Sequence, residues 1–405
     1  MKTTGIIVEY NPLHPGHIYH MEQARKQTGA DYLIAVMSGS FVQRGEPAIF
    51  DKYLRTKTAL LAGADLVLEI PVAFSTASAH EFAAYGVALL SAIGVDAVVF
   101  GSECGQIEIL KQAAYALNYE SAEFQERLRK GLKAGLTYPQ ARAKALEMED
   151  TWASVLSSPN NILGIEYLRA AEDLHSLMEF YTISRKGSGY HEDTLADANF
   201  PSASAIRGII RNSLSKDKDL LDILASHLPA VTHPAYTGAV PVFVDDFSEL
   251  LNAAILQMQA TFSIADLSPE LAARLAKPPY FPLSFEKRIQ ALKTRQLTYT
   301  RVSRALLHLA LGMREEDISR WKDEGYALYA RILGFRRQSS PLLSCLHKKS
   351  SIPLITKMAD ASQSLAPSAL ALLEQEVYAS HLYQTVRMKR SGVFQNEYTE
   401  GLVFV

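Results

Sequence analysis

Short apolar runs alternate with segments of helical length over the first 105 residues of the chain. The apolar runs, each rich in Val, Ile, Leu or Phe, cover residues 5–9, 31–37, 65–70 and 95–100. The helical segments between them lie near residues 16–28, 51–62 and 78–93. Apolar strands that alternate with helices are typical of a parallel sheet covered by helices on both faces. The pattern predicts an α/β fold whose ligands bind at the carboxyl ends of the strands.

The first strand leads into a turn and two histidines, His14 and His17, which lie three residues apart with Gly16 between them. We expect a helix to begin near Gly16, where free N–H groups and a partial positive charge favour an anion. Alone, a His-x-x-His pair is as often a weak metal pair or two surface residues. Its position between a buried strand and a helix indicates a nucleotide-phosphate site.

A second anion-binding motif is predicted at Ser204 and Arg207, three residues apart at the start of a later helix that Ser202 is expected to cap. A hydroxyl, a guanidinium and free helical N–H groups can converge there on one phosphate. The alternative is an ordinary helix cap beside a surface arginine.

Further candidates lie in loops. Gly101 follows a predicted strand, where a missing side chain lets a purine or ribose pack against the backbone, although such glycines are also common in plain turns. Asn160 and Arg185 lie in polar loops, where each alone is more often a surface residue. The long polar loop 38–47 follows a predicted strand, where loops tend to hold substrate, and its candidate substrate residues are Ser40, Gln43 and Arg44. Arg44 can offer its charge to a carboxylate or pyrophosphate, or it can pair with Glu46.

A proline-rich stretch around residues 229–241 predicts a boundary between residues 1–235, a catalytic nucleotide-binding part, and residues 236–405, a mostly helical part. From residue 281 onward the chain carries 18 Lys and Arg against 11 Asp and Glu, whereas the chain as a whole has a net charge of −2. A basic helical surface fits RNA, and a helical cap over the catalytic part is the alternative. The candidate RNA contacts are Lys287, Arg288, Lys293, Arg295, Arg301, Arg304, Arg336 and Arg337.

The chain contains only two cysteines, Cys104 and Cys345, too few for a disulfide framework or a tetrahedral zinc site. It has no run of about 20 apolar residues and no recognisable signal peptide. We therefore expect a cytoplasmic protein with no membrane segment and no disulfide partner.

Taken together, the motifs resemble those of the bacterial tRNA(Met) cytidine acetate ligases, within the HIGH-type nucleotidyltransferases. The matching segments occur in order along the chain: Val8–Pro12, His14–His17, Phe41–Pro47, Gly63–Val67, Phe100–Glu103, Ser158–Leu163, Ser202–Arg207 and Tyr299–Arg301. The resemblance implies a Rossmann-like HIGH nucleotidyltransferase sheet followed by a mostly α-helical C-terminal domain. It implies an enzyme that activates acetate with ATP as acetyl-adenylate, with Mg²⁺ assisting. The acetyl group then passes to N4 of the wobble cytidine of elongator tRNA(Met).

The resemblance also implies roles for individual residues. The catalytic set is His14, His17, Ser204 and Arg207. The ATP contacts are Ile7, Val8, Glu9, Asn11, Gly16, His17, His20, Gly101, Asn160 and Arg185, and no protein side chain is expected to ligate a metal. Ser204 and Ser40 depart from the residues expected at their positions, a threonine and a larger polar residue.

Two other readings of the motifs stay open at this point. One is a small-molecule adenylyltransferase acting on phosphopantetheine or a nicotinamide nucleotide. The other is a non-catalytic RNA-binding protein on a relict nucleotide-binding fold.

Overall fold

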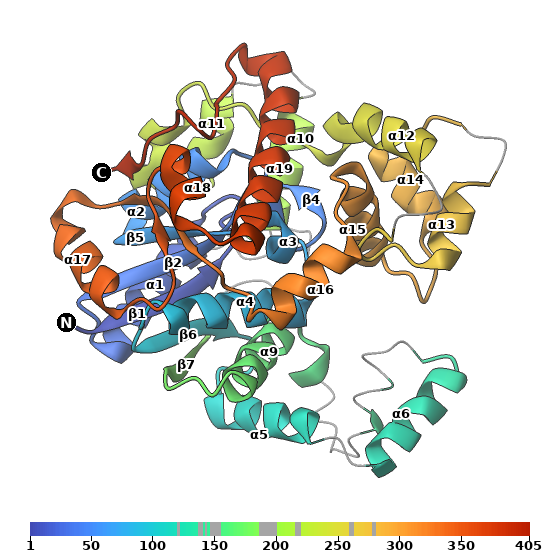
Figure 1. The fold of residues 1–405 in the computed structure, drawn as a ribbon, viewed down its shortest axis with the longest axis horizontal. Coiled ribbons are helices and arrows are strands. Elements are labelled where there is room, and N and C mark those ends of the chain that lie inside the picture. Colours follow the sequence, from blue (N-terminus) through green and yellow to red (C-terminus); the bar gives the residue numbers. More distant parts are fainter. Residues whose placement is uncertain are drawn as a thin grey trace.

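The computed structural model describes residues 1–119, 122–136, 141, 144–145, 155–185, 201–214, 220–258, 263–277 and 281–405. Its core is a sheet with the strand order β10-β8-β5-β2-β1-β6-β7, with β9 paired to β8 (Figure 1). Five strands form a parallel block, the four predicted in the first 105 residues and one that follows later: β1 (Thr3–Val8), β2 (Tyr32–Ser38), β5 (Leu66–Ile70), β6 (Ala97–Ser102) and β7 (Glu179–Ser184).

Helices cover both faces of this block, as the alternation of apolar runs predicted. Ile6, Ala35 and Val67 point to the face that carries α1 (Pro15–Thr28) and α2 (Lys52–Ala62). Ile34 and Val36 point to the opposite face, where α4 (Ala79–Ala92), α5 (Ile107–Asn118) and α9 (Pro159–Asp173) pack. Because both faces are covered, nearly every residue of β1, β2, β5 and β6 is buried, whereas β7, at the edge of the sheet, is only partly buried.

The chain runs from β1 outward through β2 to β5 and then returns to place β6 on the other side of β1. In such sheets, a reversal of strand order marks the usual ligand crevice, which here falls at the carboxyl ends of β1 and β6. The small hairpin of β3 (Phe41–Val42) and β4 (Glu46–Pro47) rises next to it from the end of β2.

The C-terminal part is mostly helical, as predicted, but it also completes the sheet. After the helices, β8 (Ala330–Phe335) pairs antiparallel with β5, and β10 (Val403–Phe404) and β9 (Leu354–Ile355) pair with β8. The sheet is therefore mixed rather than purely parallel. Chain on both sides of residue 236 builds it, and a division into two domains at that position stays a prediction.

The remaining helices are α3 (Val72–Ser75), α6 (Ala122–Lys133), α10 (Ala203–Leu214), α11 (Leu220–Ala225), α12 (Ser248–Gln257), α13 (Pro269–Leu275), α14 (Phe285–Leu292), α15 (Tyr299–Ala310), α16 (Glu315–Asp323), α17 (Ser340–Lys349), α18 (Ala361–Ser364) and α19 (Pro367–Ser391). Short 3-10 helices are η1 (Ala230–Tyr236), η2 (Val244–Phe247), η3 (Arg337–Ser339) and η4 (Met358–Asp360). Within the described ranges, no helix combines the length and apolar character needed to cross a bilayer.

Candidate active site at the carboxyl ends of β1 and β6

Two imidazoles stack at the first turn of α1. His14 is the N-cap, and its Nδ1 accepts a hydrogen bond from the Gly16 N–H at 3.1 Å. Nδ1 of His17 accepts from the main-chain N–H of His14 at 3.2 Å, and the two ring centroids lie 3.8 Å apart. Because each Nδ1 is an acceptor, each neutral ring carries its proton on Nε2. Both rings thus have an Nε2–H group available to an anion.

Gly16 is required by this geometry. A Cβ atom at that position would lie 2.9 Å from Cε1 of His14, so any side chain would push the imidazole away from its capping position. Gly16 therefore keeps His14 in its capping position.

The histidines of α1 are uncharged in the free protein. Burial lowers the pKa of His14 to about 3, and the positive charge of Arg185 acts in the same direction. Burial, with His14, Arg185 and His20 nearby, holds the pKa of His17 well below its ordinary value. Burial also lowers the pKa of His20 to about 4, although a main-chain hydrogen bond with Val99 offsets part of the effect. A bound polyphosphate would raise all three pKa values, because it favours the protonated form.

The second predicted phosphate motif meets the first. Arg207, on α10, donates from Nη1 to the main-chain oxygen of Asn11 at 2.8 Å and from Nη2 to Oγ of Ser204 at 3.1 Å. Ser202 accepts from the N–H of Ala205 at 3.1 Å, which confirms the expected helix cap. Residues almost 200 positions apart thus converge at the loop that follows β1.

The side chain of Asn11 stabilises the loop that follows β1 and does not face solvent. It is buried, and its Oδ1 accepts from the N–H of Ile49 at 2.7 Å. Ile7 and Val8 form the last part of β1, so their main chain leads directly into the same loop.

Three elements meet on the β6 side of the crevice. Nδ2 of Asn160 donates to Oε1 of Glu103 at 2.6 Å, and Arg185 donates from Nη1 to Oδ1 of Asn160 at 3.3 Å. Glu103 also accepts the N–H groups of Asn160 and Asn161, at 3.2 and 2.7 Å, so it caps α9. Gly101 lies beneath Arg185, whose Cγ would be 3.4 Å from a Cβ on the glycine. The predicted residues Gly101, Asn160 and Arg185 are therefore neighbours, and Glu103 is an organising residue to which the sequence assigned no role.

The loop 38–47 holds its three predicted substrate residues in different surroundings. The main-chain N–H of Gln43 donates to Oε1 of Glu9 at 2.9 Å, and Nε2 of Gln43 is buried without a protein partner in the described structure. Arg44 is half-buried. Ser40 is 1% exposed and donates to Oγ of Ser380 on α19 at 3.3 Å. Gln43 thus fits a substrate contact, whereas Ser40 lies in the packed interior.

The predicted RNA contacts fall into two groups, those exposed to solvent and those that are buried or paired. Lys287, Lys293, Arg295 and Arg301 are exposed on and between α14 and α15. Arg288 is buried and donates to the main-chain oxygen of Phe281 at 2.7 Å. Arg304 pairs with Asp266 at 3.0 Å. Burial and pairing keep these last two guanidinium groups from being simple phosphate contacts.

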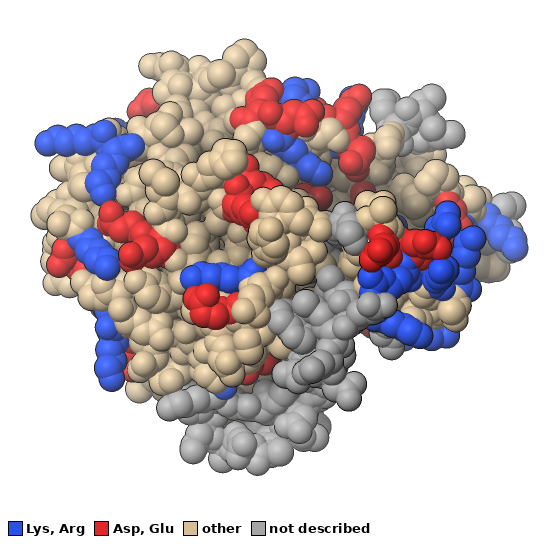
Figure 2. All heavy atoms as spheres, turned by 90° about the horizontal axis from the view of Figure 1, so that it is seen from below, with Lys and Arg blue, Asp and Glu red and all other residues tan. Residues whose placement is uncertain are grey.

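Arg336 and Arg337 lie elsewhere in the molecule. Arg336 donates to the main-chain oxygen of Leu60 at 2.9 Å, and Arg337 lies over the ring of Phe404. They precede α17, which is on the opposite side of Figure 1 from α14 and α15. Figure 2 shows that Lys and Arg side chains, mixed with acidic ones, gather at the end of the molecule where α6 and α12–α15 lie.

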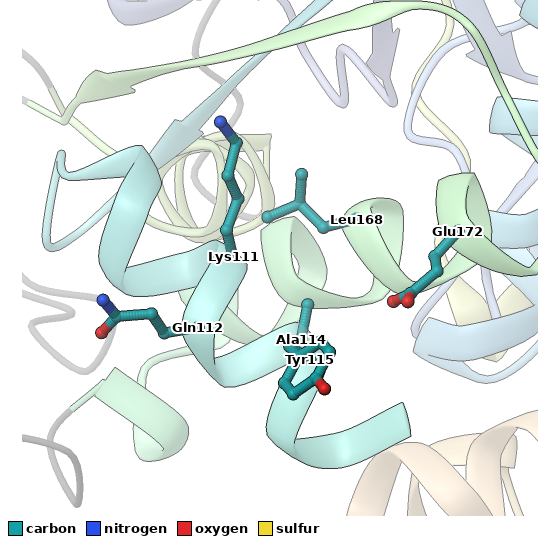
Figure 3. Close-up of a pocket in the computed structure, with 6 residues that line it drawn as sticks. All are labelled: Lys111, Gln112, Ala114, Tyr115, Leu168 and Glu172. Atoms are coloured by element: carbon teal, nitrogen blue, oxygen red, sulfur yellow. The ribbon is translucent and has the colours of Figure 1, made fainter. Parts of the chain in front are cut away.

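An open depression of about 420 Å³ lies on the outer surface of α5 and α9, away from the predicted site residues (Figure 3). Its lining consists of Lys111, Gln112, Ala114, Tyr115, Leu168 and Glu172. One cation beside one anion gives this surface no preference for a polyanion, and it contributes nothing to the crevice.

Comparison with known proteins agrees with this geometry. The HIGH Nucleotidyl Transferase family model matches residues 1–397. A tRNA(Met) cytidine acetate ligase of Acetivibrio thermocellus is 38% identical, with all of both chains covered. The enzyme of the same name from Caldicellulosiruptor saccharolyticus is 36% identical and covers 100% of this chain and 99% of its own.

Two solved structures have the same fold over the full length of both chains. One is Thermotoga maritima TmcAL bound with alpha-thio ATP, with a TM-score of 0.88 and 30% sequence identity. The other is the apo form of the same protein, with a TM-score of 0.91 and 31% identity.

Proposed function

Because the chain belongs to the tRNA(Met) cytidine acetate ligases of the HIGH nucleotidyl transferase family, we propose that it activates acetate with ATP and transfers the acetyl group to the wobble cytidine of elongator tRNA(Met). The observation that carries the proposal is the contact of Arg207 with the main chain of Asn11. It joins both phosphate motifs at the end of β1, where a triphosphate can bridge them.

In the first step, a carboxylate oxygen of acetate attacks the α-phosphorus of ATP. The bond from that phosphorus to the oxygen that bridges to the β-phosphate breaks, and pyrophosphate leaves. The step needs alignment and charge neutralisation rather than a protein nucleophile. We propose that the Nε2–H groups of His14 and His17 and the guanidinium of Arg207 stabilise the negative charge. The main-chain N–H groups of Gly16 and His17 already donate to His14, so the expected free helical N–H groups are occupied there.

In the second step, the N4 amine of the cytidine attacks the acetyl carbonyl carbon. The bond between that carbon and the oxygen of the adenylate breaks, AMP leaves, and the nitrogen loses a proton. The exposed cations of α14 and α15 would hold the RNA backbone while the base leaves its stack.

Mg²⁺ would supply further charge neutralisation at the triphosphate. Among the described residues, no group of three His, Cys, Asp or Glu side chains is arranged to bind a metal. We propose that the ion is bound by the phosphate oxygens of ATP, and that the protein works in the cytoplasm, where its tRNA substrate is found. No observation favours a small-molecule adenylyltransferase or a relict RNA-binding protein.

The assay that tests the proposed site is acetate-dependent release of pyrophosphate from ATP. We expect His17→Ala and Arg207→Ala to abolish release while tRNA binding, measured by filter retention, stays within about twofold of wild type. Lys348→Ala, on α17 at a distance from α14 and α15, serves as the matched control and should release pyrophosphate normally. Variants that release pyrophosphate at the wild-type rate, or that lose tRNA binding instead, would contradict these assignments.

A further inference from the structure

Arg55, on α2, is completely buried behind the ends of β1 and β2 and belongs to none of the predicted motifs. Among the described residues, every hydrogen bond of its guanidinium group goes to a main-chain carbonyl oxygen. Nη1 donates to Glu9 at 2.7 Å and to Ser38 at 3.0 Å, and Nε donates to Phe50 at 3.0 Å. Nη2 donates to the oxygen of Gly39.

These acceptors place the guanidinium between two neighbouring strands. Glu9 is the first residue after β1, and Ser38 is the last residue of β2. Gly39 begins the loop that carries Gln43. One planar side chain thus connects the strand end that leads to the ATP loop with the strand end that leads to the loop 38–47.

The bond to Glu9 reaches the histidines through one more residue. Tyr10 follows Glu9 with a φ of 49°, in the left-handed region that residues with a side chain seldom adopt. Its ring lies edge-on to the ring of His17, with centroids 4.9 Å apart. Because Arg55 fixes the peptide group between Glu9 and Tyr10, it also fixes the tyrosine against which His17 rests.

The charge of Arg55 is weakly compensated. In the part of the chain that the structure describes, no carboxylate accepts a hydrogen bond from it. Burial lowers the pKa of Arg55, and Asp51, Glu9 and Glu69 offset this only from a distance. Since a guanidinium stays charged inside proteins, a fixed cation lies behind the crevice and favours anions there.

We propose that Arg55 is a positioning residue for acetate activation: it sets the spacing between the ATP loop and the loop 38–47, and its charge favours the approach of a carboxylate to the triphosphate. This inference rests on the proposed function. Acetate and ATP are both anions, and their reaction needs both the fixed spacing of the two loops and the positive charge of Arg55. Lysine cannot replace it, because an ammonium carries three donors on a single nitrogen, whereas four main-chain oxygens accept from the three nitrogens of this guanidinium.

The test uses the full-length Arg55→Lys protein, with Arg25→Lys as the matched control. Arg25 lies on the same face of the sheet but bonds to Gly63 at 2.9 Å and to Asp65, at the amino ends of the strands. Acetate-dependent pyrophosphate release gives kcat and the KM values for ATP and acetate. The number of sites that bind ATP, titrated separately, corrects kcat for any unfolded fraction.

For Arg55→Lys we expect kcat per ATP-binding site to fall about 100-fold, as for a reacting group misplaced by about 1 Å, with a raised acetate KM and an ATP KM within about threefold of wild type. Arg25→Lys should keep all three constants. An Arg55→Lys protein with wild-type kcat, or one that loses only ATP-binding sites, overturns this inference and leaves the proposed function unaffected. Wild-type protein that releases no pyrophosphate with acetate overturns the proposed function and the inference with it.

Discussion

At the scale of single residues, the three histidines of the crevice are neutral until a ligand arrives. Burial lowers the pKa values of His14 and His20 to about 3 and about 4 and holds the pKa of His17 well below its ordinary value. The rings therefore act first as hydrogen-bond donors through Nε2. Any positive charge that they gain comes from binding the polyphosphate, which ties their protonation to substrate.

The same shifts predict how stability depends on pH. In the unfolded chain each imidazole has a pKa of about 6.5, so below that pH the unfolded state binds protons that the folded state does not. Stability is therefore complete above about pH 6.5 and falls as the pH drops toward the folded pKa values. Between pH 7 and 5 each histidine should remove on the order of 2 kcal/mol from the free energy of unfolding.

Urea denaturation at these two pH values checks the prediction. The loss should be smaller with ATP present, because the nucleotide stabilises protonated imidazoles. A His20→Asn protein should show a weaker pH dependence than wild type. Unfolding free energies that are equal at pH 7 and pH 5 would show that the three histidines titrate normally.

A second group of residues forms a buried ionic cluster beneath the loop 38–47. Lys52 Nζ lies 2.7 Å from Glu69, 3.3 Å from Glu376 and 3.0 Å from Glu397, and Arg331 lies 2.8 Å from Glu69. Burial and the charge of Glu69 raise the pKa of Glu376 well above its usual range. Burial also disfavours charge on Glu69 and Glu397, but Arg331 and Lys52 outweigh it, so both pKa values are lowered. With Glu376 protonated, two cations balance two carboxylates.

Because of this charge balance, replacing a glutamate by glutamine should lower the free energy of unfolding by different amounts at Glu376 and Glu397. Glu376→Gln replaces a neutral acid by a neutral amide and should lower the free energy of unfolding by no more than about 1 kcal/mol. Glu397→Gln leaves a buried cation uncompensated and should cost about 3–5 kcal/mol. Chemical denaturation at pH 7 compares the two proteins. Equal losses would mean that Glu376 is ionised and the charge assignment is wrong.

At the scale of elements, α15 docks on the tip of the loop that carries Gln43. Ser303 donates from Oγ to the main-chain oxygen of Gly45 at 2.8 Å. A Cβ on Gly45 would lie 2.4 Å from the main-chain N of Arg304, and the φ of Gly45 is 74°. The helix that presents Arg301 to solvent therefore rests against the proposed acetate loop.

Gly45→Ala tests this contact, with Gly312→Ala as its control. Gly312 also has a positive φ, 62°, but nothing within 4 Å of its Cβ position, so the control measures left-handed strain alone. That strain amounts to about 1–2 kcal/mol. We expect Gly45→Ala to lose more stability than the control and to raise the acetate KM, which Gly312→Ala should leave unchanged. Two variants with the same melting temperature and KM would contradict the docking argument.

The sequence predicts elements better than it predicts their long-range partners. The strands and helices of the first 105 residues follow from local apolar periodicity, and the structure places them within a few residues of the predicted bounds. The antiparallel return of β8 to β5 joins residues more than 260 positions apart, and no local pattern encodes it. The same holds for Arg55, whose acceptors are main-chain oxygens, and for the burial of Arg288. His14, His17 and Arg207 were identified because their motifs are contiguous, whereas their assigned roles still await the variants above.

At the scale of the whole molecule, the C-terminal segment closes the fold. Arg331 of β8 and Glu397 of the tail reach the cluster around Lys52, so the end of the chain completes a core that its beginning starts. The exposed cations of α14 and α15 lie, in sequence, between Lys52 near the start of the chain and Arg331 near its end. The candidate nucleotide site and the proposed RNA surface are thus parts of one connected structure.

A fragment of residues 1–235 tests this closure. It lacks the strand that covers β5 and leaves Lys52 without two of its buried carboxylate partners, Glu376 and Glu397. We expect no cooperative thermal transition by circular dichroism and no binding of ATP, whereas the full chain shows both. A fragment that melts cooperatively would support the two-domain division predicted from sequence.

The central claim is that one crevice makes acetyl-adenylate and delivers acetyl to a cytidine of tRNA. The direct measurement combines protein, ATP and isotopically labelled acetate with an elongator tRNA(Met) transcript, followed by nuclease digestion and mass spectrometry. A transcript with uridine at the wobble position is the control. We expect labelled N4-acetylcytidine in the first transcript only, with one AMP and one pyrophosphate per acetyl group. Pyrophosphate release without label in the cytidine transcript, or equal label in both transcripts, would contradict this claim.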